Sequence, residues 1–180
     1  MLAFASLHNT APFGAGIAPD PADTTRYAVF VGQDGLGMPD RDYYLDQSER
    51  FVAYRAAYKT YVTRMLSLAG FADADAKADA IIALETRIAE VHWPREDSRD
   101  IQKIYNPMSA EEVAKLAPEI EWNLIFDRLG LNDVPTFVVT ETTAVAGAAK
   151  IFADIPLDLV RDYLSYHFIR NHAEYLSSDF

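Results

Sequence analysis

The sequence predicts a mainly α-helical fold with a few short β-strands, including a small hairpin near the N-terminus. Two long segments carry apolar residues at alternating gaps of three and four, which is the spacing of one helix face. Short runs rich in β-branched and aromatic residues predict the strands. Half of the 180 residues are hydrophobic, which suffices for a core and argues against disorder.

The first elements are predicted between residues 11 and 31. Residues 27–31 (YAVFV) have the composition of a strand, and residues 12–17 are a candidate partner in a hairpin. Residues 11–25 as a whole are rich in Pro, Gly, Ala and Asp, which is typical of an exposed connection. Before them, residues 1–7 are expected to be the end of a helix, and they lack the basic segment of a signal peptide.

Two long helices are predicted next, over residues 48–69 and 74–92. Gly70 ends the first and Pro94 the second. The apolar stripe of the first comprises Phe51, Tyr54, Tyr58, Tyr61, Met65 and Leu68. Three apolar residues lie off this stripe and predict a second face that needs a partner: Val52, Val62 and Leu66. One face of the second helix carries Ile81, Leu84, Ile88 and Val91.

The remaining elements are shorter. Ser109 and Glu112 form a capping box that opens a short helix, and Pro118 interrupts it. Another helix follows around Trp122 and stops at Gly130, and residues 136–140 predict one more strand. The last two helices are predicted over residues 144–153 and 157–177, with Pro156 in the first turn of the second.

Residues 32–45 (GQDGLGMPDRDYYL) form the most informative segment. Three glycines and a proline precede a charged, tyrosine-rich run, which predicts a rigid turn that leads into a helix, with Gly35 and Gly37 at positive φ. We expect Arg41 to be an ion-pair hub rather than a substrate contact. We also expect Tyr43 and Tyr44 to pack with their hydroxyls on partners rather than to stack on a ligand.

A second informative segment covers residues 93–109 (WPREDSRDIQKIYNPMS). Its charged residues predict a salt-bridged loop or a solvated face, rather than a polar wall of a substrate site. These residues are Arg95, Glu96, Asp97, Arg99 and Asp100.

Together the two segments resemble the neprilysin and endothelin-converting-enzyme family of zinc metallopeptidases, bacterial type. The first is similar to the family signature GLGLPDRDYY through Gly35, Leu36, Gly37, Pro39, Arg41, Asp42, Tyr43 and Tyr44. The second is similar to the family's Arg-Asp and YNPMS-type motifs through Arg99, Asp100, Tyr105, Asn106 and Pro107. The order and separation of the motifs agree with the family, and the resemblance extends from about residue 12 onward.

The resemblance implies a helical cap domain that, with a thermolysin-like catalytic domain, encloses a cavity admitting peptides. Residues 1–180 would be part of that one helical N-terminal domain, with the catalytic zinc domain of the same polypeptide absent. In the intact parent, zinc would activate a water for peptide hydrolysis. Bacterial relatives are often exported, which is compatible with a periplasmic or secreted parent. The family motifs here would then have structural roles.

The residues themselves point to no chemistry of their own. There is no His-Glu-x-x-His motif, and we predict no Glu-x-x-x-Asp helix that supplies a third zinc ligand. His167 and His172 are five residues apart and face different sides of a helix, and we expect His167 to be a satisfied core histidine. We therefore predict no catalytic residue, no metal and no cofactor in this chain.

Composition excludes other classes. The formal net charge of −11 argues against a nucleic-acid partner, and no apolar run is long enough for a membrane segment. The prediction is a non-catalytic cap-domain portion of a peptidase, inactive alone, that gates substrate access. The alternative is a stand-alone helical binding or scaffold module.

Overall fold

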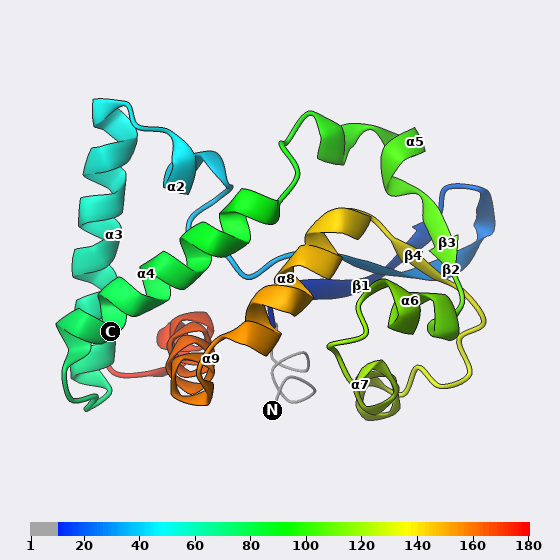
Figure 1. The fold of residues 1–180 in the computed structure, drawn as a ribbon. Coiled ribbons are helices and arrows are strands. Elements are labelled where there is room, and N and C mark those ends of the chain that lie inside the picture. The colour runs from blue at the N-terminus through cyan, green and yellow to red at the C-terminus, as the bar shows by residue number, and fades with distance from the viewer. Residues whose placement is uncertain (1–10) are drawn as a thin grey trace. The chain divides into compact units, whose positions relative to one another are not determined.

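The computed structural model describes residues 11–180, so His8 and the predicted end of a helix in residues 1–7 lie outside the described residues. The fold is mainly helical with a small four-stranded sheet, as predicted (Figure 1). The chain divides into two compact units. Of the described residues, the sheet unit comprises 11–35 and Val91–Ala153, and the helical unit comprises Leu36–Glu90 and Asp154–Phe180.

The sheet has the strand order β1-β2-β4-β3. β1 (Phe13–Asp20) and β2 (Asp23–Gln33) form the predicted antiparallel hairpin. The expectation of an irregular, exposed connection over residues 11–25 is therefore wrong for most of that range. These residues form strand β1 and the start of β2, because the backbone of β2 pairs with that of β1. β4 (Phe137–Val139) pairs parallel with β2 and antiparallel with β3 (Asn106–Met108), and is buried along its whole length.

Short helices complete the sheet unit. They are η1 (Asp97–Arg99), α5 (Ile101–Ile104), α6 (Ala110–Leu116), α7 (Trp122–Leu129) and α8 (Thr142–Asp154). The predicted capping box at Ser109 and Glu112 is present, and α7 stops at Gly130 with a φ of 68°. A row of rings joins α7 to the sheet: Phe126 stacks on Phe137 with centroids 4.3 Å apart.

The helical unit contains α2 (Asp42–Leu45), α3 (Glu49–Leu68), α4 (Ala74–Val91), α9 (Leu157–Asn171) and η2 (Ala173–Tyr175). α3 and α4 agree with the predicted helices within one residue at each end. α9 ends six residues earlier than predicted, because His172 leaves the helical conformation. Pro156 lies before the first turn of α9, as its N-cap, rather than within it.

The buried face of α3 differs from the predicted stripe. Four residues of α3 are buried: Tyr58, Val62, Met65 and Leu66. Val62 and Leu66, expected to need an outside partner, are completely inaccessible, whereas Tyr54, Tyr61 and Leu68 are exposed. Periodicity placed the apolar side of the helix correctly to within about one residue's rotation, but tertiary packing decides which edge of that side is covered.

No helix among residues 11–180 is long and apolar enough to cross a membrane.

Candidate functional site

A buried polar cluster lies in the core of the helical unit. Its centre is Glu85 on α4, whose side chain is fully inaccessible. Three donors reach its carboxylate: the Tyr44 hydroxyl at 2.8 Å, the Tyr58 hydroxyl at 3.0 Å and His167 Nε2 at 2.8 Å. Tyr166 donates to the Tyr58 hydroxyl at 3.1 Å. We call these five residues the Glu85 cluster. It joins α2, α3, α4 and α9.

The Glu85 cluster also holds the glycine-rich turn. The Tyr44 hydroxyl accepts hydrogen bonds from the backbone N–H groups of Gly37, at 3.1 Å, and Met38, at 2.9 Å. The same hydroxyl donates to Glu85. Tyr44 thus connects the turn to the buried carboxylate, which agrees with the expectation that its hydroxyl reaches a partner.

The two glycines of the turn serve different purposes. Gly35 has a φ of 95°, as predicted, in the region that a side chain resists. Gly37 is not among the glycines of positive φ, so that expectation is wrong. Its requirement is steric, because a Cβ there would lie 1.7 Å from the Tyr58 hydroxyl oxygen and 3.0 Å from Glu85 Oε1.

Burial sets the charge state of the tyrosines. It raises the pKa of Tyr44, Tyr58 and Tyr166 well above the usual tyrosine value, and the negative charge of Glu85 acts in the same direction. All three hydroxyls are therefore protonated in the folded protein and available as donors.

These shifts predict a loss of stability at alkaline pH. A tyrosine whose pKa is raised by folding contributes its full stability below the unfolded pKa of about 10, and loses it as the pH rises above that value. We expect the midpoint of urea unfolding to fall steeply above about pH 10. The dependence should be shallower in Tyr58→Phe and unchanged in Tyr175→Phe, an exposed position of the same unit. Equal slopes in all three proteins would contradict this prediction.

The other residues of the first motif are exposed or half-buried in the helical unit. Asp40 Oδ1 accepts from the Asp42 N–H at 3.0 Å and so supports the start of α2. Arg41 makes no ion pair with any of residues 11–180, and its Nε is buried without a hydrogen-bond partner, so the ion-pair hub is wrong. Tyr43 stacks on Tyr54 with centroids 5.6 Å apart. Leu36 is half-buried and Pro39 is exposed.

The second motif lies in the sheet unit, where Asn106 binds three backbone carbonyls. Its Nδ2 donates to Lys103 at 2.8 Å, Val139 at 3.0 Å and Thr140 at 3.2 Å. These contacts fasten the end of α5 and the end of β4 to β3. Pro107 is exposed on β3, at the edge of the sheet, where a missing N–H costs least.

Tyr105 and the charged residues of the motif also make structural contacts. The Tyr105 hydroxyl donates to Asp20 Oδ1 at 2.8 Å, and Arg26 pairs with the other oxygen of Asp20 at 2.9 Å. The hydrogen bond from the Ala22 N–H, followed by those from Tyr105 and Arg26, lowers the pKa of Asp20. Asp100 caps α5 through the Gln102 N–H at 3.0 Å, and Arg99 is exposed.

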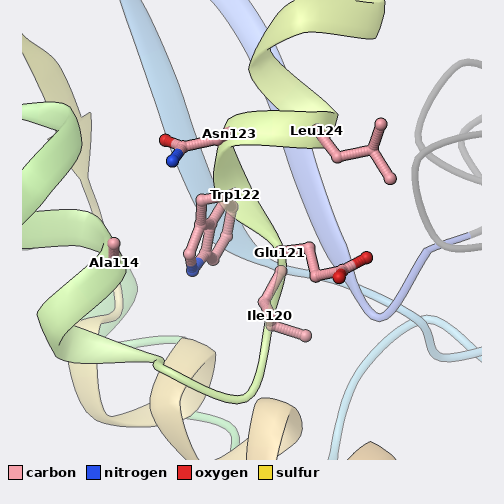
Figure 2. Close-up of a pocket in the computed structure, with 6 residues that line it drawn as sticks. All are labelled: Ala114, Ile120, Glu121, Trp122, Asn123 and Leu124. Carbon is pink, nitrogen blue, oxygen red and sulfur yellow. The ribbon is translucent and has the colours of Figure 1, made fainter.

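An open groove of about 470 Å³ lies beside α6 and α7 in the sheet unit (Figure 2). It is lined by Ala114, Ile120, Glu121, Trp122, Asn123 and Leu124. The Trp122 indole is buried and donates to the Ala117 carbonyl at 3.0 Å. Among the residues of 11–180 that line the groove, Glu121 is the only ionisable one and is exposed, so these residues supply no paired acid and base and no nucleophile.

No group of three His, Cys, Asp or Glu side chains among residues 11–180 could hold a metal ion. One Glu-x-x-x-Asp spacing does occur, at Glu96 and Asp100, contrary to the expectation that it is absent. It falls on η1, and Asp100 caps the next helix, so the pair does not project from one helix face. His167, expected to be a satisfied core histidine, is buried against Glu85.

The mainly helical fold and the two motifs agree with the N-terminal region of a neprilysin-type peptidase, the class that the sequence resembles. A family model described as peptidase family M13, for its N-terminal region, matches residues 1–180, and the chain belongs to that family. This confirms the resemblance to the neprilysin and endothelin-converting-enzyme family.

Curated relatives agree. Endothelin-converting enzyme-like 1 of Rattus norvegicus is 28% identical over 173 residues, which are 93% of this chain and 22% of the relative. Endothelin-converting enzyme 1 of Cavia porcellus is 28% identical over 181 residues, which are 96% of this chain and 24% of the relative. The chain thus spans less than a quarter of the length of these enzymes.

Solved structures have the same fold. Zinc metalloprotease Zmp1 of Mycobacterium tuberculosis in an open state matches with a TM-score of 0.89 and 27% identity, over 97% of this chain and 28% of that chain. Zmp1 in complex with an inhibitor matches with a TM-score of 0.88 and 26% identity, over the same shares. PepO from Lactobacillus rhamnosis shares the fold, with a TM-score of 0.76 and 18% identity over 98% of this chain and 28% of that chain.

Sequence reasoning missed Glu85, Tyr58 and Tyr166 as partners of the motif. A signal was present: Glu85 falls between Ile81 and Ile88, on the apolar face of α4. A carboxylate on such a face needs buried hydrogen-bond partners, and the hydroxyls of Tyr44 and Tyr58 supply two of them.

Proposed function

We propose that the chain forms part of the helical N-terminal cap of an M13-type zinc peptidase and has no catalytic activity of its own. The observation that carries this proposal is the family match over all 180 residues of a sequence without a His-Glu-x-x-His motif. Its partner is the zinc-containing catalytic domain of the same polypeptide, and its substrates in that setting are peptides. The chain contributes by limiting which substrates reach the zinc.

The placement of the motif residues supports a structural contribution. Tyr44 and Gly37 fix the glycine-rich turn to the core of the helical unit, and Asn106 fixes β3 and β4 of the sheet unit. A cap that excludes large substrates must keep its shape against thermal motion. Buried hydrogen bonds and close packing provide that rigidity within each unit. We propose that both sequence motifs are retained for this purpose.

We first expect the isolated chain to show neither tight zinc binding nor peptidase activity. The isolated chain should not bind zinc tightly, because no cluster among residues 11–180 offers three ligands. It should not hydrolyse peptides either, because the sequence lacks the His-Glu-x-x-His motif that supplies the general base. Equilibrium dialysis with zinc and a fluorogenic peptide assay measure both properties. One tightly bound zinc per chain, with turnover abolished by a chelator, would contradict the proposal and favour an unrecognised catalytic site.

A further inference from the structure

The peptide group between Asp34 and Gly35 lies just after β2, in the sheet unit, and Asp34 is the one aspartate of the sequence that precedes a glycine. Asp34 is exposed, and its Oδ1 accepts a hydrogen bond from the N–H of Gly35 at 2.7 Å. The carboxyl carbon Cγ is one bond from Oδ1 and therefore lies next to this amide nitrogen. Cyclisation of an aspartate requires this approach, and groups that are already held together need little further ordering to react.

Two glycines leave room for this arrangement. A Cβ at Gly14, on β1, would lie 3.1 Å from Asp34 Oδ2, so the carboxyl group rests against a backbone position that has no side chain. Gly35 has a φ of 95° and no Cβ, so no side chain shields its nitrogen. The fold thus holds the carboxyl group beside a nitrogen that is open to reaction.

His92 contacts the oxygen of the same peptide group. Its side chain is buried, and its Nε2 lies 3.2 Å from the main-chain oxygen of Asp34. A carbonyl oxygen can only accept, so Nε2 carries the proton and donates it. When the Gly35 amide loses its proton, the negative charge is shared between the nitrogen and this oxygen, where a fixed donor stabilises it. His92 therefore favours the form of the amide that attacks a carboxyl carbon.

We propose that Asp34 is a site of isomerisation to isoaspartate and that His92 promotes the reaction. In the first step the Gly35 nitrogen bonds to Asp34 Cγ. The bond from Cγ to one carboxyl oxygen breaks, and this oxygen leaves as water with the amide proton and one proton from solvent. The product of this step is a succinimide ring.

The second step consumes one water molecule. Its hydroxyl group adds to the main-chain carbonyl carbon of Asp34, which the hydrogen bond from His92 polarises, and its other proton goes to the Gly35 nitrogen as the bond between that carbon and the nitrogen breaks. The result is isoaspartate, in which the main chain runs through Cγ and is one atom longer before Gly35. The modification therefore alters the chain path where β2 leads into the glycine-rich turn.

Incubation of the intact chain at neutral pH, followed by proteolysis and mass spectrometry with electron-transfer fragmentation, measures isoaspartate at each position. Asp97 is the internal reference, because the side chain of Ser98 shields the next nitrogen and Lys103 pairs with the Asp97 carboxylate. We expect Asp34 to isomerise at least about tenfold faster than Asp97, a factor that corresponds to about 1.4 kcal/mol of activation free energy.

The same chain unfolded in urea tests the contribution of the fold. Asp34 should isomerise faster in the folded chain than in the unfolded one, because folding holds the carboxyl group against Gly35 and brings His92 to the peptide oxygen. Asp97 should show the opposite order, because its ion pair with Lys103 exists only in the folded chain.

Three variants separate the roles of the residues. His92→Phe retains an aromatic ring without a donor, so it should slow isomerisation of Asp34 in the folded chain and leave the rate in urea unchanged. His92→Gln retains an N–H donor and should recover part of the rate. Asp34→Glu would need a larger ring and should accumulate no isomer. Circular dichroism verifies that each variant is folded.

Two results would overturn the site: a rate at Asp34 no higher than at Asp97, or a lower rate in the folded chain than in urea, which would mean that the fold protects this peptide group. Equal rates for folded His92→Phe and the unaltered chain would overturn the role of His92. If His92→Phe does not fold, the comparison of the unaltered chain with His92→Gln, each folded and in urea, decides.

Discussion

Glu85→Ala is expected to lower the free energy of unfolding by about 3–5 kcal/mol, the range for removing one partner of a buried charged network. The substitution leaves His167 without its acceptor and removes the acceptor of both the Tyr44 and Tyr58 hydroxyls. It also opens a cavity where a fully inaccessible side chain stood. Urea unfolding followed by circular dichroism measures the change.

The matched control is Glu90→Ala, an exposed glutamate on the same helix, for which we expect a change below about 0.5 kcal/mol. Glu85→Gln retains the shape of the side chain and is expected to have an intermediate effect, and it serves if Glu85→Ala does not fold. Similar midpoints for Glu85→Ala and Glu90→Ala would show that the cluster does not stabilise the helical unit.

Gly37→Ala is the second substitution for which we expect a large loss. The added methyl would lie 1.7 Å from the Tyr58 hydroxyl oxygen and 2.6 Å from its ring carbon Cζ, so either Tyr58 or the turn must move. Overpacking of this kind costs about 1–3 kcal/mol. Moving Tyr58 also breaks its hydrogen bond to Glu85, which adds about 1–3 kcal/mol.

Two other glycines separate the steric cause from the conformational one. Gly35→Ala is expected to cost about 1–2 kcal/mol, because its φ of 95° disfavours a side chain. At Gly16, on β1, a Cβ would meet nothing within 4 Å, and Gly16→Ala should be close to neutral. Thermal or urea unfolding of the three variants measures the order Gly37, Gly35, Gly16. A Gly37→Ala midpoint equal to that of Gly16→Ala would contradict the packing seen here.

Most helices and strands could be predicted from local sequence signals, because the interactions behind those signals are present in the folded chain. The capping box at Ser109, the stop at Gly130 and the apolar face of α4 each depend on residues within a few positions of one another. Such short-range interactions do not depend on which elements pack against them in the fold. The hairpin was predicted for the same reason, from the β-branched and aromatic residues of β2.

What escaped prediction depends on long-range partners. Whether Tyr61 or Val62 is covered on α3 is decided by packing between helices that are distant in sequence. The steric need for Gly37 arises from Tyr58 and Glu85, which are far from it in the sequence. The three-residue strand β3 carries a proline and exists because β4 pairs with it. None of these partners is visible in the local composition.

The central claim, a cap that limits substrate size without performing chemistry, is tested most directly by a chimera. The matched 28% of Mycobacterium tuberculosis Zmp1 would be replaced by this chain, using the fold agreement given by a TM-score of 0.89. The measurement compares the cleavage rate of a short peptide with that of an unfolded protein that contains the same cleavage sequence. We expect the chimera to retain zinc-dependent cleavage of the short peptide and to cleave it faster than the long substrate. Gly37→Ala in the grafted part should reduce this preference. A chimera that hydrolyses both substrates at equal rates, with no effect of Gly37→Ala, would contradict the gating role.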